Sequence, residues 1–206
     1  MHQKEIISSG KKLAEARKVL IMLHGRGASA EDILRVAPYL HLEDFTLLAP
    51  QATNYTWYPY SFLVPRSQNE PWLSSALDLV KEITADVNQA GIPNERIYFL
   101  GFSQGACLTL EFIARNPGRW GGAVAFTGGL IGDKLDKENY KGNFDGTPVF
   151  IGTSDPDPHV PVARVKESTS ILSAMSATVT EKVYPNIGHT ITEDEIEKAN
   201  QLVFNS

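Results

Sequence analysis

A single serine stands between two glycines in the stretch GFSQGA, where Gly101 and Gly105 flank Ser103. The apolar run IYFL precedes this stretch and ACLTL overlaps its end, an order that predicts a buried strand, a sharp turn and a helix. Small neighbours let a strand and a helix approach closely there, so the hydroxyl stands clear of the sheet. The spacing favours nucleophilic chemistry at Ser103. Because a free serine is a poor nucleophile at neutral pH, that chemistry needs a base within hydrogen-bond reach.

An acid and a histidine follow Ser103 along the chain. Asp157 lies in DPDPHVP after the strand-like PVFIGT, and His189 lies in YPNIGHTI after the strand-like TVTEKV. Serine, aspartate and histidine in this chain order, each after a strand, are typical of a triad in which the histidine is the base and the acid orients it. The alternative is that the glycine-serine-glycine spacing marks only a tight turn, and the later acid and histidine disfavour it.

Four stretches resemble the carboxylesterase/phospholipase family of α/β-hydrolases, which includes the acyl-protein thioesterases. They are LHGRGASAEDI, GFSQGA, DPDPHVP and GHTI, in register across nearly the whole chain. The resemblance implies an α/β-hydrolase fold and a serine hydrolase of carboxylic esters or thioesters, with Ser103 as nucleophile, Asp157 as the orienting acid and His189 as base. It also implies that the backbone N–H groups of Arg26 and Gln104 form the oxyanion hole. The Arg26 side chain is a second possible feature of the site, as an attractor of anionic substrates.

The acid has a competitor, because Asp155 and Asp157 lie two residues apart on one loop. The family resemblance favours Asp157, three residues before Val160, with Pro156 and Pro158 stiffening the loop. Asp155 is then expected to be a solvated or loop-capping residue.

The remaining histidines and the single cysteine are expected outside the triad. His24 resembles the histidine of the family's HG pair, which shapes the oxyanion loop, and His159 lies too close to the acid on its own loop to be its partner. His2 and His41 have no acidic or serine context, and the scattered set is a poor basis for a metal site. Cys107 lies in an apolar helical stretch and is predicted to be a buried packing residue.

Two segments are candidates for shaping a pocket. Residues 54–65, NYTWYPYSFLVP, are aromatic and interrupted by proline, so we predict a loop. Trp57, Tyr58 and Phe62 are the candidate substrate-binding residues, and the alternative is that these aromatic rings fill the core. Residues 128–146 are charged and punctuated by glycine, which predicts a solvated surface loop, with a mobile cover over the site as the alternative.

The candidate residues need strands to carry them. Short apolar runs without polar alternation predict strands buried on both faces: VLIML from Val19, FTLLAP from Phe45, IYFLGF from Ile97, GAVAFTG from Gly122 and PVFIGT from Pro148. Helical patterns lie between them, over 29–40, from Pro71 to near Gly91, over 162–175 and from Thr192 onward. Ser29 with Asp32, and Thr192 with Glu195, have the spacing of a capping box at a helix start. This alternation predicts an α/β domain spanning residues 1–206, with a mostly parallel sheet, helices on both faces and a site at the carboxyl ends of the strands.

Composition limits the classes of partner. The 206 residues are 42% hydrophobic, enough for a core, and the net charge of −5 with interspersed signs offers no basic stripe for nucleic acid. One cysteine excludes an internal disulfide and suits a cytoplasmic location. The charged N-terminus and the lack of eighteen consecutive apolar residues predict neither a secretion signal nor a membrane span.

These observations lead to one predicted function. We expect a serine carboxylesterase that needs no cofactor and hydrolyses small to medium acyl esters through an acyl-enzyme. The alternatives are an acyl-protein thioesterase or lysophospholipase with a long-chain acyl groove, and a ligand-binding relative that has lost turnover. The substrate is a small-molecule ester or thioester, and neither acyl length nor oligomeric state follows from the sequence.

Overall fold

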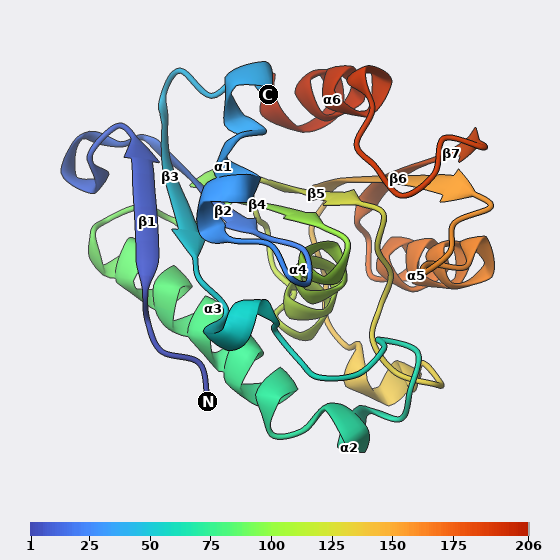
Figure 1. Ribbon diagram of the computed structural model, residues 1–206. Coiled ribbons are helices and arrows are strands. Elements are labelled where there is room, and N and C mark those ends of the chain that lie inside the picture. The colour runs from blue at the N-terminus through green and yellow to red at the C-terminus, as the bar shows by residue number, and fades with distance from the viewer. Residues whose placement is uncertain (206) are drawn as a thin grey trace.

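A seven-stranded sheet forms the centre of the molecule in the computed structural model, which describes residues 1–205 (Figure 1). The strands are β1 Ile6–Gly10, β2 Lys18–Leu23, β3 Phe45–Pro50, β4 Ile97–Phe102, β5 Gly122–Phe126, β6 Pro148–Asp155 and β7 Thr178–Pro185. Their order across the sheet is β1-β3-β2-β4-β5-β6-β7. Strand β1 runs antiparallel to β3, and the other neighbouring pairs are parallel. The predicted mostly parallel sheet is confirmed.

Helices cover both faces of this sheet. They are α1 Ala30–Leu34, α2 Arg66–Asn69, α3 Trp72–Gln89, α4 Gln104–Arg115, α5 Val162–Ala174 and α6 Glu193–Ala199. Helices α3, α4 and α5 pack on one face, and α1 and α6 pack on the other (Figure 1). In β2, Ile21 belongs to the first core and Leu20 to the second, which explains why the strand is apolar at successive positions. Of the helices described over residues 1–205, none combines the length and apolar character that crossing a membrane requires.

The helix predicted over residues 29–40 is shorter than expected. The side chain of Ser29 accepts from the Asp32 N–H and the Asp32 side chain accepts from the Ser29 N–H, so the predicted capping box is confirmed. Helix α1 nevertheless ends at Leu34, and Pro38 lies in a short 3-10 turn. Proline lacks a backbone N–H and disfavours α-helical geometry in the residue before it, which accounts for the early end.

The other predicted helices lie where the apolar periodicity places them. Helix α3 ends at Gln89, and Gly91 just beyond it has a φ of +88°, the left-handed geometry typical of a residue that follows a helix. Helix α6 begins after Thr192, which forms the predicted capping box with Glu195. Strand β1 has no counterpart in the sequence analysis, because IISSG is short and largely polar and is paired on one edge only.

The surface loop predicted over residues 128–146 is only partly a surface loop. Its first five residues are buried. Arg164 Nη1 donates to the Leu130 carbonyl over 3.0 Å, and Glu111 Oε2 accepts from the Ile131 N–H over 3.0 Å. The prediction is wrong for this part of the segment. Buried charged side chains of α4 and α5 supply the hydrogen bonds that water was expected to supply.

Candidate active site

Ser103 occupies a strained turn between β4 and α4. Its φ is +55° and its ψ is −116°, a conformation that a residue with a side chain adopts at a cost, and its N–H donates to the Phe126 carbonyl over 2.9 Å. A Cβ on Gly101 would lie 2.3 Å from the Gly105 oxygen, and a Cβ on Gly105 would lie 2.0 Å from the Leu23 oxygen. Both glycines are therefore required for the helix to pack this closely on the strands.

His189 connects Ser103 to Asp157. Its Nε2 lies 2.8 Å from the Ser103 Oγ, and its Nδ1 lies 2.8 Å from the Asp157 Oδ2. An ionised carboxylate only accepts hydrogen bonds, so the imidazole proton belongs on Nδ1 and Nε2 is left to accept from the serine hydroxyl. The structure thus brings together the three side chains of the predicted triad, which follow β4, β6 and β7 in the chain.

The Asp157 carboxyl is fully buried and held from two sides. Its Oδ1 accepts from the N–H groups of His159 and Val160, both over 2.8 Å. Burial alone would raise the pKa of Asp157, but these two donors and His189 outweigh it and hold the pKa below its ordinary value. Asp155, at the end of β6, is exposed and makes no side-chain contact with the imidazole among the described residues.

Two residues that line the cavity with Ser103 have backbone N–H groups without a partner among the described residues. Gln104 is the first residue of α4, where the N–H has no helical partner and the helix dipole favours an anion. Arg26 lies in the loop after β2, and both residues line the same cavity as Ser103. Within residues 1–205, neither N–H donates to another group. They have the free donors that a developing oxyanion requires.

His24 fixes the start of the loop that carries Arg26. The ring is completely buried, its Nδ1 lies 2.8 Å from the Gly25 carbonyl, and its Nε2 accepts from the Ala52 N–H over 3.0 Å. Burial lowers the pKa of His24, which therefore favours the neutral ring that this pairing needs. The expectation that His24 shapes the loop agrees with these contacts.

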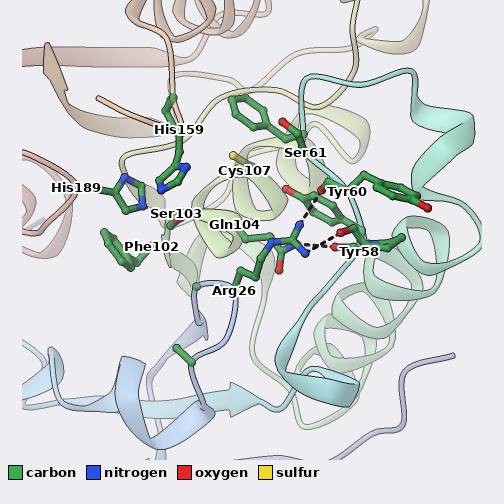
Figure 2. A pocket seen from close by; sticks show the side chains of 15 residues that line it. Arg26, Tyr58, Tyr60, Ser61, Phe102, Ser103, Gln104, Cys107, His159 and His189 are labelled. Atoms are coloured by element: carbon green, nitrogen blue, oxygen red, sulfur yellow. Dashed lines mark hydrogen bonds between the residues drawn. The ribbon is translucent and has the colours of Figure 1, made fainter. Parts of the chain in front are cut away.

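A cavity of about 610 Å³ opens beside Ser103 (Figure 2). It is lined by Gly25, Arg26, Ala28, Tyr58, Pro59, Tyr60, Ser61, Phe62, Phe102, Ser103, Gln104, Cys107, His159, Val160 and His189. Its size is within the usual range for small-molecule sites, and aromatic and aliphatic side chains form much of its wall. Among residues 1–205, no three histidine, cysteine, aspartate or glutamate side chains group as a metal site would require.

The structure separates the three aromatic residues that the sequence analysis grouped. Tyr58 and Phe62 line the cavity, as predicted, whereas Trp57 is fully buried behind its wall. The indole N–H of Trp57 donates to the His24 carbonyl over 2.9 Å, and the two rings lie 5.0 Å apart. A buried indole needs an acceptor for its N–H, and the loop after β2 provides one, so Trp57 supports the site without lining it.

His159 is a lining residue that the sequence analysis missed. Its place next to the predicted acid excludes it as the triad partner, yet its ring stands edge-on to the His189 imidazole at 4.9 Å between centroids. The loop DPDPHVP held a usable signal, because His159 lies only two residues after the predicted acid Asp157 on the same loop. Cys107 also lines the cavity, and burial raises the pKa of its thiol to about 12, so it is not a thiolate at neutral pH.

Comparisons with known proteins show the family to which the chain belongs. The sequence profile of the Phospholipase/Carboxylesterase family matches residues 1–204. The chain is 28% identical to acyl-protein thioesterase 1 of Saccharomyces cerevisiae, over 90% of this chain and 91% of the relative. It is 25% identical to a probable, SOBER1-like carboxylesterase of Arabidopsis thaliana, over 88% of this chain and 76% of the relative.

Solved structures give the same result. The crystal structure of a phospholipase/carboxylesterase from Dyadobacter fermentans is 55% identical, superposes with a TM-score of 0.97, and is covered over 98% of this chain and 97% of that one. A carboxylesterase of Bacillus cereus shares the fold at 21% identity, with a TM-score of 0.78 over 96% of this chain and 92% of that one. This chain therefore belongs to the phospholipase/carboxylesterase family, whose members are α/β-hydrolases that act on carboxylic ester bonds.

Proposed function

We propose that the protein is a carboxylesterase that hydrolyses small to medium acyl esters through an acyl-enzyme on Ser103. The observation that carries the proposal is the position of the His189 ring, with one nitrogen 2.8 Å from the Ser103 oxygen and the other 2.8 Å from the Asp157 carboxylate. This is the arrangement that nucleophile activation by a base and an orienting acid requires.

In the acylation half of the reaction, the Ser103 Oγ attacks the acyl carbon while its proton passes to His189 Nε2. The resulting imidazolium is stabilised by Asp157, which keeps the proton on Nδ1. The carbonyl oxygen becomes an oxyanion and is met by the N–H groups of Arg26 and Gln104. When the tetrahedral intermediate collapses, the ester C–O bond breaks and Nε2 gives its proton to the departing alcohol.

In the deacylation half, water takes the place of the alcohol. His189 Nε2 removes a proton from the water as its oxygen attacks the acyl carbon, and the same two N–H groups hold the second oxyanion. Collapse breaks the bond to Ser103 Oγ, which regains a proton from Nε2. The carboxylic acid leaves and the free serine is restored.

The cavity supports the binding of an apolar acyl group beside Ser103. Its volume is about 610 Å³, and the buried side chains of Tyr58, Phe62 and Cys107 form part of its wall. The rival function is thioester hydrolysis on a long acyl chain, and the observation that favours it is the similarity to a yeast acyl-protein thioesterase.

The test compares wild type with Ser103→Ala on p-nitrophenyl esters from acetate to palmitate and on the matching thioesters. We expect the variant to lose about 10⁴- to 10⁶-fold in kcat, because the activated nucleophile is gone. Ser170→Ala is the matched control, since its hydroxyl bonds to the Lys166 carbonyl on the outside of α5. A variant that keeps a tenth or more of the rate would place the nucleophile elsewhere, and a wild-type preference for palmitoyl thioesters would favour the rival.

A further inference from the structure

The side chains of Arg26 and Gln104 bind the same short segment of the cavity wall, residues 56–60. The Arg26 guanidinium donates from Nη1 to the Pro59 carbonyl over 2.9 Å and from Nη2 to the Tyr60 carbonyl over 2.7 Å. Nη1 also donates to the Thr56 hydroxyl over 3.0 Å. Figure 2 shows this side chain extended across the mouth of the cavity toward the segment.

The Gln104 side chain binds the same segment at Trp57 and Tyr58. Its Nε2 donates to the Tyr58 carbonyl over 2.8 Å, and its Oε1 accepts from the Trp57 N–H over 2.9 Å. The side chain is almost fully buried, so both ends of a desolvated amide are satisfied by neighbouring residues of one irregular stretch. This pairing specifies where the segment lies relative to the first turn of α4.

Two further hydrogen bonds join the loop after β2 to residues 55–57. The Gly27 N–H donates to the Tyr55 carbonyl over 2.7 Å, and the Trp57 indole N–H donates to the His24 carbonyl over 2.9 Å. The loop after β2 is thus bound to the segment on both sides of Arg26. Within the described residues Arg26 has no carboxylate partner, and its guanidinium lines the cavity while it bonds the Thr56, Pro59 and Tyr60 oxygens, so its attraction of anionic substrates stays a prediction.

We propose that Arg26 and Gln104 are positioning residues whose side chains hold the oxyanion donors and the cavity wall in one fixed register. The inference rests on the proposed function, because the donors in question are the backbone N–H groups of these same two residues. A substrate seated against Tyr58 and Tyr60 is thereby delivered with its carbonyl oxygen at the two donors. The backbone N–H of each residue donates to the oxyanion, and the side chain of the same residue binds the cavity wall.

This role predicts a specific kinetic signature. Substitution of either side chain keeps the backbone N–H but no longer fixes its position. Misplaced donors weaken binding of the transition state more than binding of the ground state. Arg26→Ala and Gln104→Glu are therefore expected to lower kcat by about 10- to 100-fold while KM changes by no more than about threefold. Arg26→Lys should fall between Arg26→Ala and wild type, because an ammonium cannot bond the Pro59 and Tyr60 oxygens together.

The decisive readout is binding of a transition-state analogue. A trifluoromethyl ketone with the preferred acyl group adds to Ser103 and places an oxyanion on the donors, whereas the alcohol product does not. For each variant the inhibition constant of the ketone should rise by the same factor as kcat/KM falls, with product inhibition unchanged. Guanidinium chloride at millimolar concentration should restore part of the activity of Arg26→Ala, and sodium chloride at equal ionic strength should not.

The controls are Arg35→Ala and Gln68→Glu, which change exposed side chains away from the cavity and are expected to keep wild-type kinetics. If Gln104→Glu fails to fold, the Arg26 series decides the question, since that side chain is exposed. Wild-type kcat and ketone affinity in Arg26→Ala, or a loss confined to KM, would overturn the inference. The proposed function fails separately, if wild-type Ser103 itself proves unreactive toward the ketone.

Discussion

The two halves of the site are built in different ways. The oxyanion half comes from the ends of β3, β2 and β4, which are neighbours in the sheet, and its supporting side chains His24, Trp57 and Gln104 are almost fully buried. The triad half, apart from Ser103, follows β6 and β7, and its His189 lies on a partly exposed loop with 19% of its side chain accessible. That loop is joined to its neighbour by few bonds, one of them from the Gly188 N–H to the Ser154 hydroxyl over 3.2 Å.

The difference follows the chemistry each half has to perform. Donors that stabilise a charge are most effective when they are fixed before the charge appears, which favours burial and many hydrogen bonds. The imidazole has to accept a proton on one side of the reaction and deliver it to a departing group on the other, so a small movement of the His189 ring is useful. Asp157 anchors the ring through its hydrogen bond to Nδ1.

The largest effect in this comparison is expected from a substitution that disrupts only the triad half. Asp157→Asn should lower kcat by about 10³- to 10⁴-fold, because an amide in place of the carboxylate no longer holds the His189 proton on Nδ1. Asp155→Asn, on the same loop, should keep the activity within about threefold, since its exposed side chain does not reach the imidazole. Steady-state hydrolysis of an activated ester measures both.

The comparison of these two variants also checks the oxyanion half. Affinity for a neutral product analogue should stay near wild type in Asp157→Asn, because the donors and the cavity wall do not depend on the acid. An equal loss of activity in both aspartate variants would show that the loop as a whole is needed, and not the single carboxylate that faces His189.

The smallest expected effect is a difference between the two halves in the pH at which each loses stability. Burial lowers the pKa of His24 below its ordinary 6.5. As the pH falls below 6.5, His24 therefore becomes protonated in the unfolded chain before it does in the folded protein. The stability that the neutral ring contributes is therefore complete above pH 6.5 and is lost as the pH falls toward its folded pKa. The pKa of Asp157 is held below its ordinary 3.8, so its contribution is complete above pH 3.8 and is lost only below that. Acidification should weaken the oxyanion half first.

Urea unfolding at pH 7.5 and pH 5.5 measures this difference. Wild type should have a lower urea midpoint at pH 5.5, and His24→Gln, though less stable throughout, should lose less between the two values. His2 adds to the same trend, since burial lowers its pKa too and its ring contacts the Trp57 carbonyl. The exposed His41 supplies the control variant, His41→Gln. A His24→Gln protein with the full wild-type pH dependence would show that the oxyanion half is not the acid-sensitive one.

Much of the fold was predictable because its signals are local. Apolar runs without alternation predicted the parallel strands, and the capping boxes at Ser29 and Thr192 predicted two helix starts. The carboxyl ends of parallel strands lie at the same edge of a sheet, so the sequence alone predicted that Ser103, Asp157 and His189 lie close together. Strand β1 was not predictable in the same way, because only its pairing with β3 makes the polar stretch IISSG extended.

The cavity was harder to predict because aromatic side chains follow the backbone of an irregular segment. Asn54 and Tyr55 both have positive φ, which turns the chain so that Trp57 faces the core and Tyr58 faces the cavity. Composition cannot distinguish these two neighbours. The roles of the Arg26 and Gln104 side chains were equally hidden, since their partners are backbone carbonyls and N–H groups that any residue type supplies.

The central claim is that His189 and Asp157 make the Ser103 oxygen reactive. A fluorophosphonate probe followed by peptide mass spectrometry tests it most directly, with wild type, His189→Ala and Asp155→Asn treated alike. The account predicts one adduct on the peptide that carries Ser103 in wild type and in Asp155→Asn, and labelling slowed by about 10³-fold or more in His189→Ala. An adduct on another residue, or equal labelling of Ser103 with and without the imidazole, would contradict it.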